Sequence, residues 1–170
     1  MNDLITLKAA ITAQASGEIE AMAWPFGTVD RIGDMIEKGA FASIPLPLPM
    51  LFGHDHNDPV GAWTEAEERP DGLFLKGRLL VEDLPRAREV AALVKSGAVR
   101  GVSIGFITKK AAPRKGGRSI SQLELIEASL VSIPMNPKAR ITSAKSATEA
   151  LRIADLINRA AAHLKEGTSP

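Results

Sequence analysis

Cysteine is absent from this chain of 170 residues. Its absence excludes disulfides, thiolate zinc sites and a cysteine nucleophile, so any covalent catalysis must use another side chain. The chain also lacks a long apolar run at its N-terminus, where "MNDLITLKAAITAQ" includes Asp3. This composition predicts neither a signal peptide nor a membrane span, and we expect the protein to work in the cytosol.

Neither sign of charge dominates, since the formal net charge is +1. Aromatic residues are also scarce, at 4%. No Lys/Arg-dense face with interleaved aromatics is present, so nucleic-acid binding through phosphate neutralisation is not predicted. Hydrophobic residues make up 45% and charged residues 24%, as in ordinary globular proteins. The length and composition predict one folded domain with a short appended tail.

The hydrophobic pattern predicts a mainly β protein with flanking helices. Apolar alternation predicts two strands between Leu4 and Trp24, and further strands over 60–67, 72–81, 99–108 and 123–133. Helical spacing appears within 82–99 and again over 151–164, and "KKAAPRKGGR" (109–118) reads as an exposed basic loop. Because a lone sheet of this size would expose its edges, we expect a small closed or strongly curved sheet.

Proline at every second residue in "IPLPLPM" forbids helix around Pro45, Pro47 and Pro49. We expect an extended edge segment there that leads into Leu51 and Phe52. The next residues, "GHDHNDPVG", hold two of the three histidines of the chain.

The "HDHND" stretch permits a metal site, part of a proteolytic site or a plain polar turn. His54, His56 and Asp58 approach the HxHxDH pattern of zinc hydrolases. That pattern requires histidine after the aspartate, where this chain has Pro59, and the remaining histidine, His163, lies on the expected terminal helix.

A candidate nucleophile lies in "RGVSIGF". In an alternating strand Gly101, Ser103 and Gly105 share one face, so the Ser103 hydroxyl would project where its neighbours have no side chain. This arrangement leaves room for another backbone or a peptide substrate to approach. A purely structural serine fits the same pattern. No helix follows Ser103, so the strand-turn-helix context of a GxSxG elbow is absent.

Glu127 is the third candidate, in the apolar run "LELIEASLV". A carboxylate near the core needs a partner, and a histidine ring is one such partner. The alternative is an outward-facing glutamate on an amphipathic strand.

The order of the motifs resembles the HK97-type prohead protease family, the capsid maturation serine peptidases of caudoviruses. The motifs are, in order, "VDRIGDMIEKGAF", "FGHDHNDPVG", "GLFLKGRLL", a helix, "SGAVRGVSIGF" and "IEASLVSIPMNPKA". The similarity covers about Ile19 to Ile141. It implies a small β-barrel surrounded by helices, related to herpesvirus assemblin. Such proteases act inside the assembling procapsid in the host cytoplasm, where they cleave scaffold, or the scaffolding segment of the major capsid protein, and usually themselves.

The resemblance also implies roles for individual residues. His54 falls at the catalytic histidine, in the pair His54–Asp55 before Pro-hydrophobic-Gly, and Ser103 falls at the nucleophile. Glu127, in E-x-S-L-V, is our choice for the acid, ahead of Asp55, which an extended segment would point away from His54. For the oxyanion we expect the backbone at Met135–Asn136, with help from an arginine: Arg140, Arg114 or Arg118.

These expectations divide the chain into a protease barrel over 1–141 and a linker with a C-terminal helix over 142–170. The small polar residues at 142–148 suit proteolytic cutting, so we expect self-cleavage there. No cofactor is implied, the expected partners are capsid or scaffold protein, and self-association remains open. The runner-up functions are a non-catalytic assembly module that pairs its Pro-rich edge with a partner strand, and a zinc hydrolase built on His54, His56 and Asp58.

Overall fold

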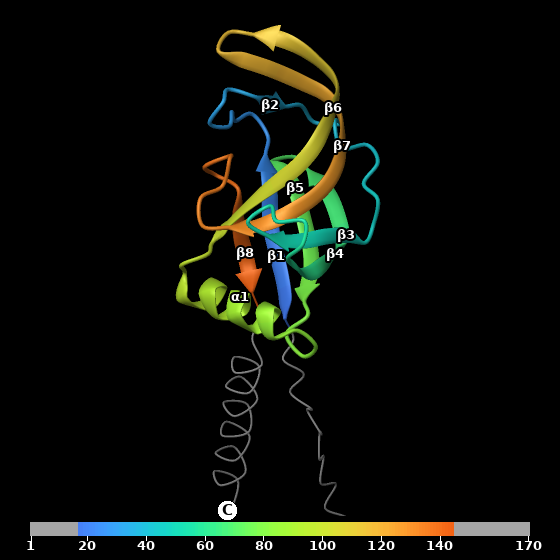
Figure 1. Cartoon of the computed structure of the whole chain (residues 1–170). Coiled ribbons are helices and arrows are strands. Elements are labelled where there is room, and N and C mark those ends of the chain that lie inside the picture. The colour runs from blue at the N-terminus through green and yellow to red at the C-terminus, as the bar shows by residue number, and fades with distance from the viewer. Residues whose placement is uncertain (1–16, 145–170) are drawn as a thin grey trace, which may run out of the picture.

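A closed β-barrel dominates the computed structural model, which describes residues 17–144 (Figure 1). Within that range the elements are β1 (Glu18–Pro25), β2 (Met35–Ile36), β3 (Leu48–Phe52), β4 (Pro59–Arg69), β5 (Gly72–Leu79), α1 (Pro85–Ser96), β6 (Gly101–Arg114), β7 (Gly117–Val131) and β8 (Arg140–Ala144).

The barrel closes through β7. The strands follow the order β7-β3-β4-β5-β1-β8-β6, and β6 pairs back onto β7, so seven strands form a ring within the described residues. The short β2 adds to β7 in parallel, with Met35 opposite Ser119. The expected closed, mainly β architecture is confirmed. Closure pairs strand edges that an open sheet would leave exposed.

The interior is filled by alternate side chains of the strands, as the alternation predicted. Trp63 is fully buried, and its indole N–H donates to the carbonyl of Ala128 at 2.9 Å, so its polar edge is satisfied inside the apolar core. The largest fully buried companions include Ile19, Leu48, Met50, Leu73, Leu75, Leu125 and Leu130.

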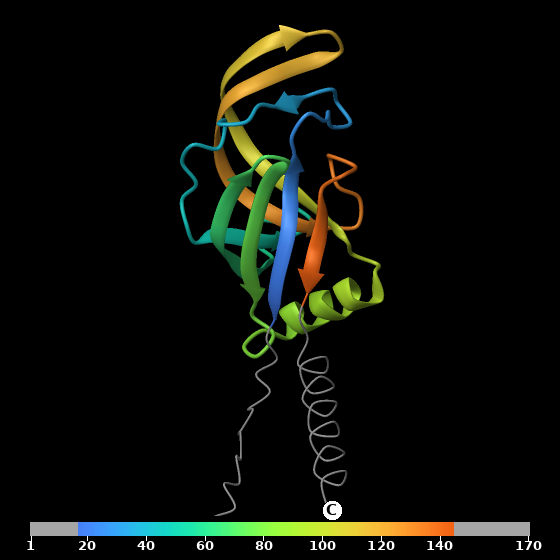
Figure 2. The same cartoon turned by 180° about the vertical axis from the view of Figure 1, so that it is seen from behind.

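The helix α1 covers one end of the barrel, beside the ends of β1 and β5 (Figures 1 and 2). It begins at Pro85 and ends before Gly97, which has φ 78° and donates its N–H to Val94. Both ends agree with the sequence, because proline suits a first turn and glycine suits the left-handed position after the last. Ala87 and Val90 are the residues it buries.

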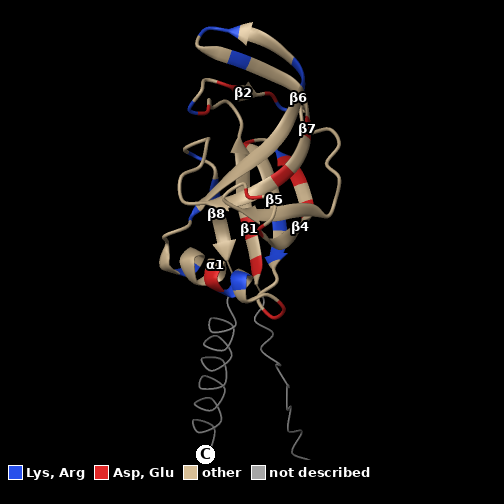
Figure 3. Cartoon of the chain, in the orientation of Figure 1, with Lys and Arg blue, Asp and Glu red and all other residues tan. Residues whose placement is uncertain are grey.

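The prediction of an exposed basic loop over 109–118 is wrong. β6 and β7 continue through it as one antiparallel ribbon, with Ala112 opposite Ser119 and a tight turn at Lys115–Gly116. The ribbon extends beyond the barrel (Figures 1 and 2), and its exposed part carries several lysines and arginines (Figure 3). Polar side chains lie on the exposed positions of the ribbon, whereas Ile120 and Leu123 of β7 are buried.

Two further boundaries differ from expectation. The end of the Pro-rich segment is not an edge, because β3 pairs with β4 from Leu48 onward and with β7 from Met50 onward, whereas Pro45 and Pro47 lie before the strand. The expected linker at 142–148 is wrong for residues 142–144, which belong to β8 and pair with β1. The strand expected near residues 4–11 and the helix over 151–164 lie outside the described residues. No helix of residues 17–144 has the length and apolar character needed to cross a membrane.

Candidate active site

Three neighbouring strands bring the candidate residues together on the outside of the barrel. Ser103 of β6 lies opposite Ser129 of β7, and Ser129 in turn lies beside Leu51 of β3. Side chains directly opposite in an antiparallel pair share a face, with Cβ atoms about 4.5–5.5 Å apart. The Ser103 face therefore continues across β7 toward the end of β3, where His54 follows.

A β-bulge sets the position of Glu127. Glu127 lies opposite Gly105, whereas Leu125 lies opposite Phe106, so Ile126 is an extra residue without a partner on β6. An extra residue shifts the alternation of the side chains that follow it. Leu125 consequently points into the core, and Glu127 shares the outer face with Ser103.

The two glycines that flank Ser103 are covered by other parts of the same chain. A Cβ on Gly105 would lie 2.3 Å from Glu127 Oε1, and a Cβ on Gly101 would lie 2.7 Å from Cδ of Pro134. The sequence predicted that these glycines leave room for another part of the backbone or for a peptide; the room is taken by Glu127 at Gly105 and by Pro134 and the Val131 carbonyl at Gly101, so no space for a peptide remains at either position. They instead allow Glu127 and Pro134 to lie close on either side of Ser103, which is itself 3% exposed.

His54 follows β3 in a turn, with the unusual positive φ of 62°. A non-glycine residue in this region costs on the order of 1 kcal/mol, so the surrounding bonds must hold it there. The N–H of Gly53 donates to the carbonyl of Leu130, and the N–H of His54 donates to Ser129 Oγ at 3.0 Å. Asp55 does not face the ring: its carboxylate accepts the N–H of Asn57 at 2.8 Å.

The His54 ring contacts the carboxylate that the sequence favoured. Its Nδ1 lies 2.6 Å from Oε1 of Glu127, whose side chain is 4% exposed, while the ring is 43% exposed. Ser129 Oγ donates to the other carboxylate oxygen, Oε2, at 2.6 Å. The hydrogen bond from Glu127 raises the pKa of His54 above its ordinary 6.5, against the opposing effect of partial burial.

Ser129 is a member of this network that the sequence argument missed. It accepts from the backbone of His54 and donates to the side chain of Glu127, so it ties the histidine turn to the acid. The available signal was its spacing, since residues two apart on a strand share a face. The role of Ser129 depends on the turn after β3, which that spacing does not reveal.

The Ser103 hydroxyl forms no hydrogen bond with any of residues 17–144. The contact of Nδ1 with Glu127 leaves Nε2 as the ring nitrogen available to the serine. Contacts between a nucleophile and its base are often long in a free enzyme and shorten in the substrate complex. Pairing nonetheless limits the separation, because the His54 backbone touches the side chain of Ser129, the neighbour of Ser103 across the ribbon.

The loop after β7 borders Ser103 on another side. Met135 is exposed, whereas Asn136 is 2% exposed and donates from Nδ2 to Thr28 Oγ1 at 2.9 Å. Met135 and Asn136 line a small cavity of about 20 Å³ together with Ser103. Their expected oxyanion role stays a prediction.

The arginines expected near the oxyanion differ in their positions. Arg140 lies opposite Gly101, on the face of Ser103, so its role also stays a prediction. Arg114 and Arg118 lie at the far end of the β6–β7 ribbon, where they bind Gly33 O and Asp34. Their expected contribution at Ser103 is wrong.

The alternative zinc site is not assembled by this geometry. Within residues 17–144, no group of three or more potential ligands of the His, Cys, Asp or Glu type lies close enough to hold a metal ion. His54 binds Glu127, whereas Asp58 binds Nε of Arg86 in α1 at 2.9 Å. His56 binds neither His54 nor Asp58; it lines a cavity of about 250 Å³ together with Glu127.

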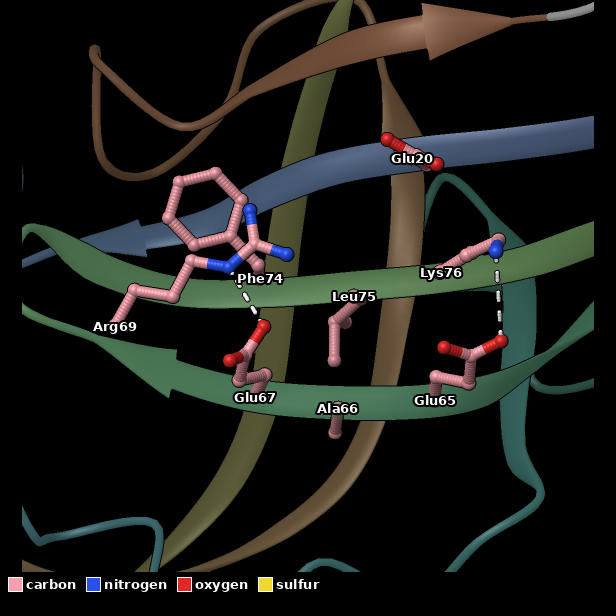
Figure 4. A pocket seen from close by; sticks show the side chains of 8 residues that line it. All are labelled: Glu20, Glu65, Ala66, Glu67, Arg69, Phe74, Leu75 and Lys76. Carbon is pink, nitrogen blue, oxygen red and sulfur yellow. Dashed lines mark hydrogen bonds and ion pairs between the residues drawn. The ribbon is translucent and has the colours of Figure 1, made fainter.

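A further cavity, of about 160 Å³, lies among β1, β4 and β5 and contains none of these residues (Figure 4). Four of its five charged side chains pair with each other: Arg69 binds Glu67 at 2.7 Å, and Lys76 lies 3.6 Å from Glu65. Mutual pairing of exposed charges leaves little demand for a ligand.

A closed β-barrel that carries a serine, a histidine and a buried carboxylate on one outer strip is typical of a barrel-type serine protease. The model of one protein family, the caudovirus prohead serine protease, matches residues 4–153. The chain belongs to this family.

Two relatives illustrate the family. The prohead protease of Escherichia phage T5 is 31% identical over 126 residues, which cover 69% of this chain and 58% of the T5 protein. The capsid polyprotein of Pseudomonas phage PAJU2 is 39% identical over 125 residues, which cover 69% of this chain and 18% of the polyprotein. The chain therefore spans less than two thirds of the length of either relative.

A solved phage structure shows the same fold. The bacteriophage T4 capsid assembly protease, gp21, aligns with a TM-score of 0.55 at 15% identity, over 67% of this chain and 80% of the T4 chain. The KSHV protease in complex with a hexapeptide phosphonate inhibitor aligns with a TM-score of 0.48 at 13% identity, over 73% of this chain and 63% of that one.

Proposed function

We propose that this protein is a serine endopeptidase of phage procapsid maturation, with Ser103 as nucleophile, His54 as general base and Glu127 as the acid that orients it. One observation carries the proposal: the contact of His54 with the buried Glu127 lies on the outer strip that holds Ser103. Family membership supports the reaction type. The names of the PAJU2 and T5 relatives support a capsid protein as the substrate, and scaffold protein is the alternative substrate in this proposal.

Acylation begins when Nε2 of His54 removes the proton from Ser103 Oγ as the oxygen attacks the scissile carbonyl. Glu127 accepts the hydrogen bond from Nδ1–H, which fixes the tautomer and stabilises the imidazolium that forms. The imidazolium then gives its proton to the leaving amine, the C–N bond breaks, and an acyl-enzyme remains.

Deacylation repeats these transfers with water. His54 removes a proton from water, the resulting oxygen attacks the ester carbonyl, and the proton returns to Ser103 as the acid product leaves. Backbone N–H groups at Met135–Asn136, assisted by Arg140, hold the oxyanion in this proposal.

Coexpression with the cognate major capsid protein or scaffold tests the function. Intact-mass measurement should show trimmed substrate with the wild-type chain and full-length substrate with Ser103→Ala or His54→Ala. His56→Ala is the matched control, because it alters the same turn but should retain trimming. Trimming that persists in Ser103→Ala would contradict the assignment.

We propose self-cleavage as a second reaction of the same site, leaving the C-terminal segment as a removable tail. Residues 142–144 are paired in β8, and paired backbone is a poor substrate. The expected cut therefore narrows to 145–148. Action inside the procapsid, in the host cytoplasm, belongs to the same proposal, and self-association remains a prediction.

A further inference from the structure

Next to Ser103 lies a cavity of about 380 Å³ that is rich in arginine. Three of its nine lining residues are arginines, Arg31, Arg100 and Arg140, and none is acidic. The remaining lining is apolar or small: Gly101, Ser132, Ile133, Pro134, Pro137 and Ala139.

These three arginines have no ionic partner within residues 17–144. Arg31 donates from Nε to the carbonyl of Pro134 at 3.2 Å, which leaves its charge uncompensated, and no ion pair joins Arg100 or Arg140 to a described carboxylate. By contrast, Arg69, Arg86 and Arg118 each bind an acid. All three are exposed, so solvent weakens their mutual repulsion, and their guanidinium groups are free to bind an anionic occupant of the cavity.

The cavity lies on one side of Ser103 along β6. Gly101 and Pro134 belong to it, and Arg140 lies opposite Gly101 on the face that Ser103 shares. On the other side of Ser103, over Gly105, lies the carboxylate of Glu127 with its histidine.

This placement assigns the cavity to one side of the scissile bond. The histidine must reach the leaving amine, so the leaving portion of a substrate passes on the His54 side. The acyl portion then extends toward Gly101 and the arginines. The cavity on the histidine side, lined by Pro49, Leu51 and Ile126, contains no arginine.

We infer that the arginine cavity is a subsite for an acidic substrate side chain, aspartate or glutamate, on the acyl side of the cleaved bond. Guanidinium groups bind carboxylates through paired charge-assisted hydrogen bonds, and Ile133 and Pro137 would cover the methylene part of the same side chain. The inference rests on the proposed peptidase function and adds to it a preference for acidic residues.

A library of peptides, prepared by chymotryptic digestion of a bacterial lysate, tests the preference. The full chain and its variants are incubated with the library, and mass spectrometry identifies the new termini. We expect aspartate and glutamate to be enriched about five- to tenfold at one acyl-side position of the wild-type products. Arg100→Gln and Arg140→Gln should each reduce that enrichment at least about threefold.

Charge reversal and a matched control complete the design. Arg100→Glu should shift the preference at that position toward lysine and arginine, whereas Arg78→Gln, at an exposed arginine of β5, should leave it unchanged. A role of Arg140 only at the oxyanion would slow acidic and neutral peptides equally, leaving the enrichment intact.

The outcomes separate the two proposals. Cleavage that depends on Ser103 but shows no acidic enrichment, or enrichment that survives both arginine variants, overturns the subsite and leaves the peptidase function standing. No cleavage that depends on Ser103 overturns the proposed function and the subsite with it.

Discussion

The two halves of the β6–β7 ribbon have the same strand pairing and very different surroundings. Near the barrel, Ser103 and Glu127 are buried between β8 on one side and β3 on the other. Beyond Phe106 much of the ribbon is exposed: Ile107 is 51% exposed, although Ile120 and Leu123 of β7 remain buried. Strand pairing alone therefore does not create the site, which requires the flanking strands and their loops to exclude water and supply the histidine.

Of the substitutions considered on the two halves of the ribbon, Glu127→Gln should have the largest effect. It keeps the shape of the Glu127 side chain and removes its negative charge. Cleavage should fall about 10²–10⁴-fold, because the imidazolium loses its counter-charge and the tautomer is no longer fixed. Glu124→Gln is the matched control on the exposed half of β7, where Glu124 binds Lys109. Peptide cleavage rates measure both, and equal losses would contradict the distinction between the halves.

The pH dependence of the same pair has a definite sign. Glu127 raises the pKa of His54 above 6.5, and the base must be neutral, so kcat/KM should rise through a pKa above 6.5 in the wild type. In Glu127→Gln the rising limb should move to lower pH. The stability that His54 gains from Glu127 is fully present below pH 6.5 and is lost as pH rises through the folded pKa. An unmoved limb would assign the titration to another group.

Gly105→Ala should rank next, with cleavage reduced about 10²-fold and unfolding easier by about 1–3 kcal/mol. The added methyl would occupy the position of the Glu127 carboxylate and force it off His54. NMR titration should show a lowered His54 pKa. Ala112→Val, the control, adds two carbons on the exposed half of β6 and should change neither the cleavage rate nor the His54 pKa. Normal cleavage by Gly105→Ala would show that Glu127 does not need its observed position.

Ser129→Ala should have a smaller effect, about tenfold on cleavage and about 1–3 kcal/mol on the free energy of unfolding. The substitution removes the donor to Glu127 Oε2 and the acceptor of the His54 N–H. Ser121→Ala, on the exposed half of β7, is the control. A loss confined to stability, with unchanged kcat and an unchanged pH profile, would reduce Ser129 to a structural residue.

The smallest effect is expected at the tip of the ribbon. Lys115→Gln should alter cleavage of short peptides less than about twofold and stability by less than about 0.5 kcal/mol, because the residue is exposed and remote from the flanking strands. A larger loss of peptide cleavage would mean that the outer half of the ribbon contributes to the site after all.

The sequence predicts the parts of the fold that local signals determine. Pro85 and Gly97 mark the ends of α1, and "RPDG" marks the turn between β4 and β5, because proline and glycine restrict the backbone regardless of context. Residues 142–144 escape prediction because their strand pairs with β1, which is distant in sequence: Ser143 lies opposite Glu20. Residues 109–118 pair with their neighbours across a tight turn, Ala112 with Ser119, but their basic and glycine-containing composition is that of an exposed loop.

The site divides in the same way. Ordered motifs point to His54, Ser103 and Glu127, and the structure brings the histidine and the glutamate into contact. The bulge at Ile126, the cover of Pro134 over Gly101 and the gathering of the arginines depend on strand register and closure. A pattern of residue types does not specify register across strands that are far apart in the chain.

Labelling with a peptidyl phosphonate tests the central claim most directly, because it requires an activated serine and no knowledge of the natural substrate. The intact mass of the full chain should increase by one adduct, and peptide mapping should locate it on Ser103. The adduct should be absent from Ser103→Ala, strongly reduced in His54→Ala and retained in His56→Ala. An adduct that forms equally in Ser103→Ala, or that maps to another serine, would contradict the account.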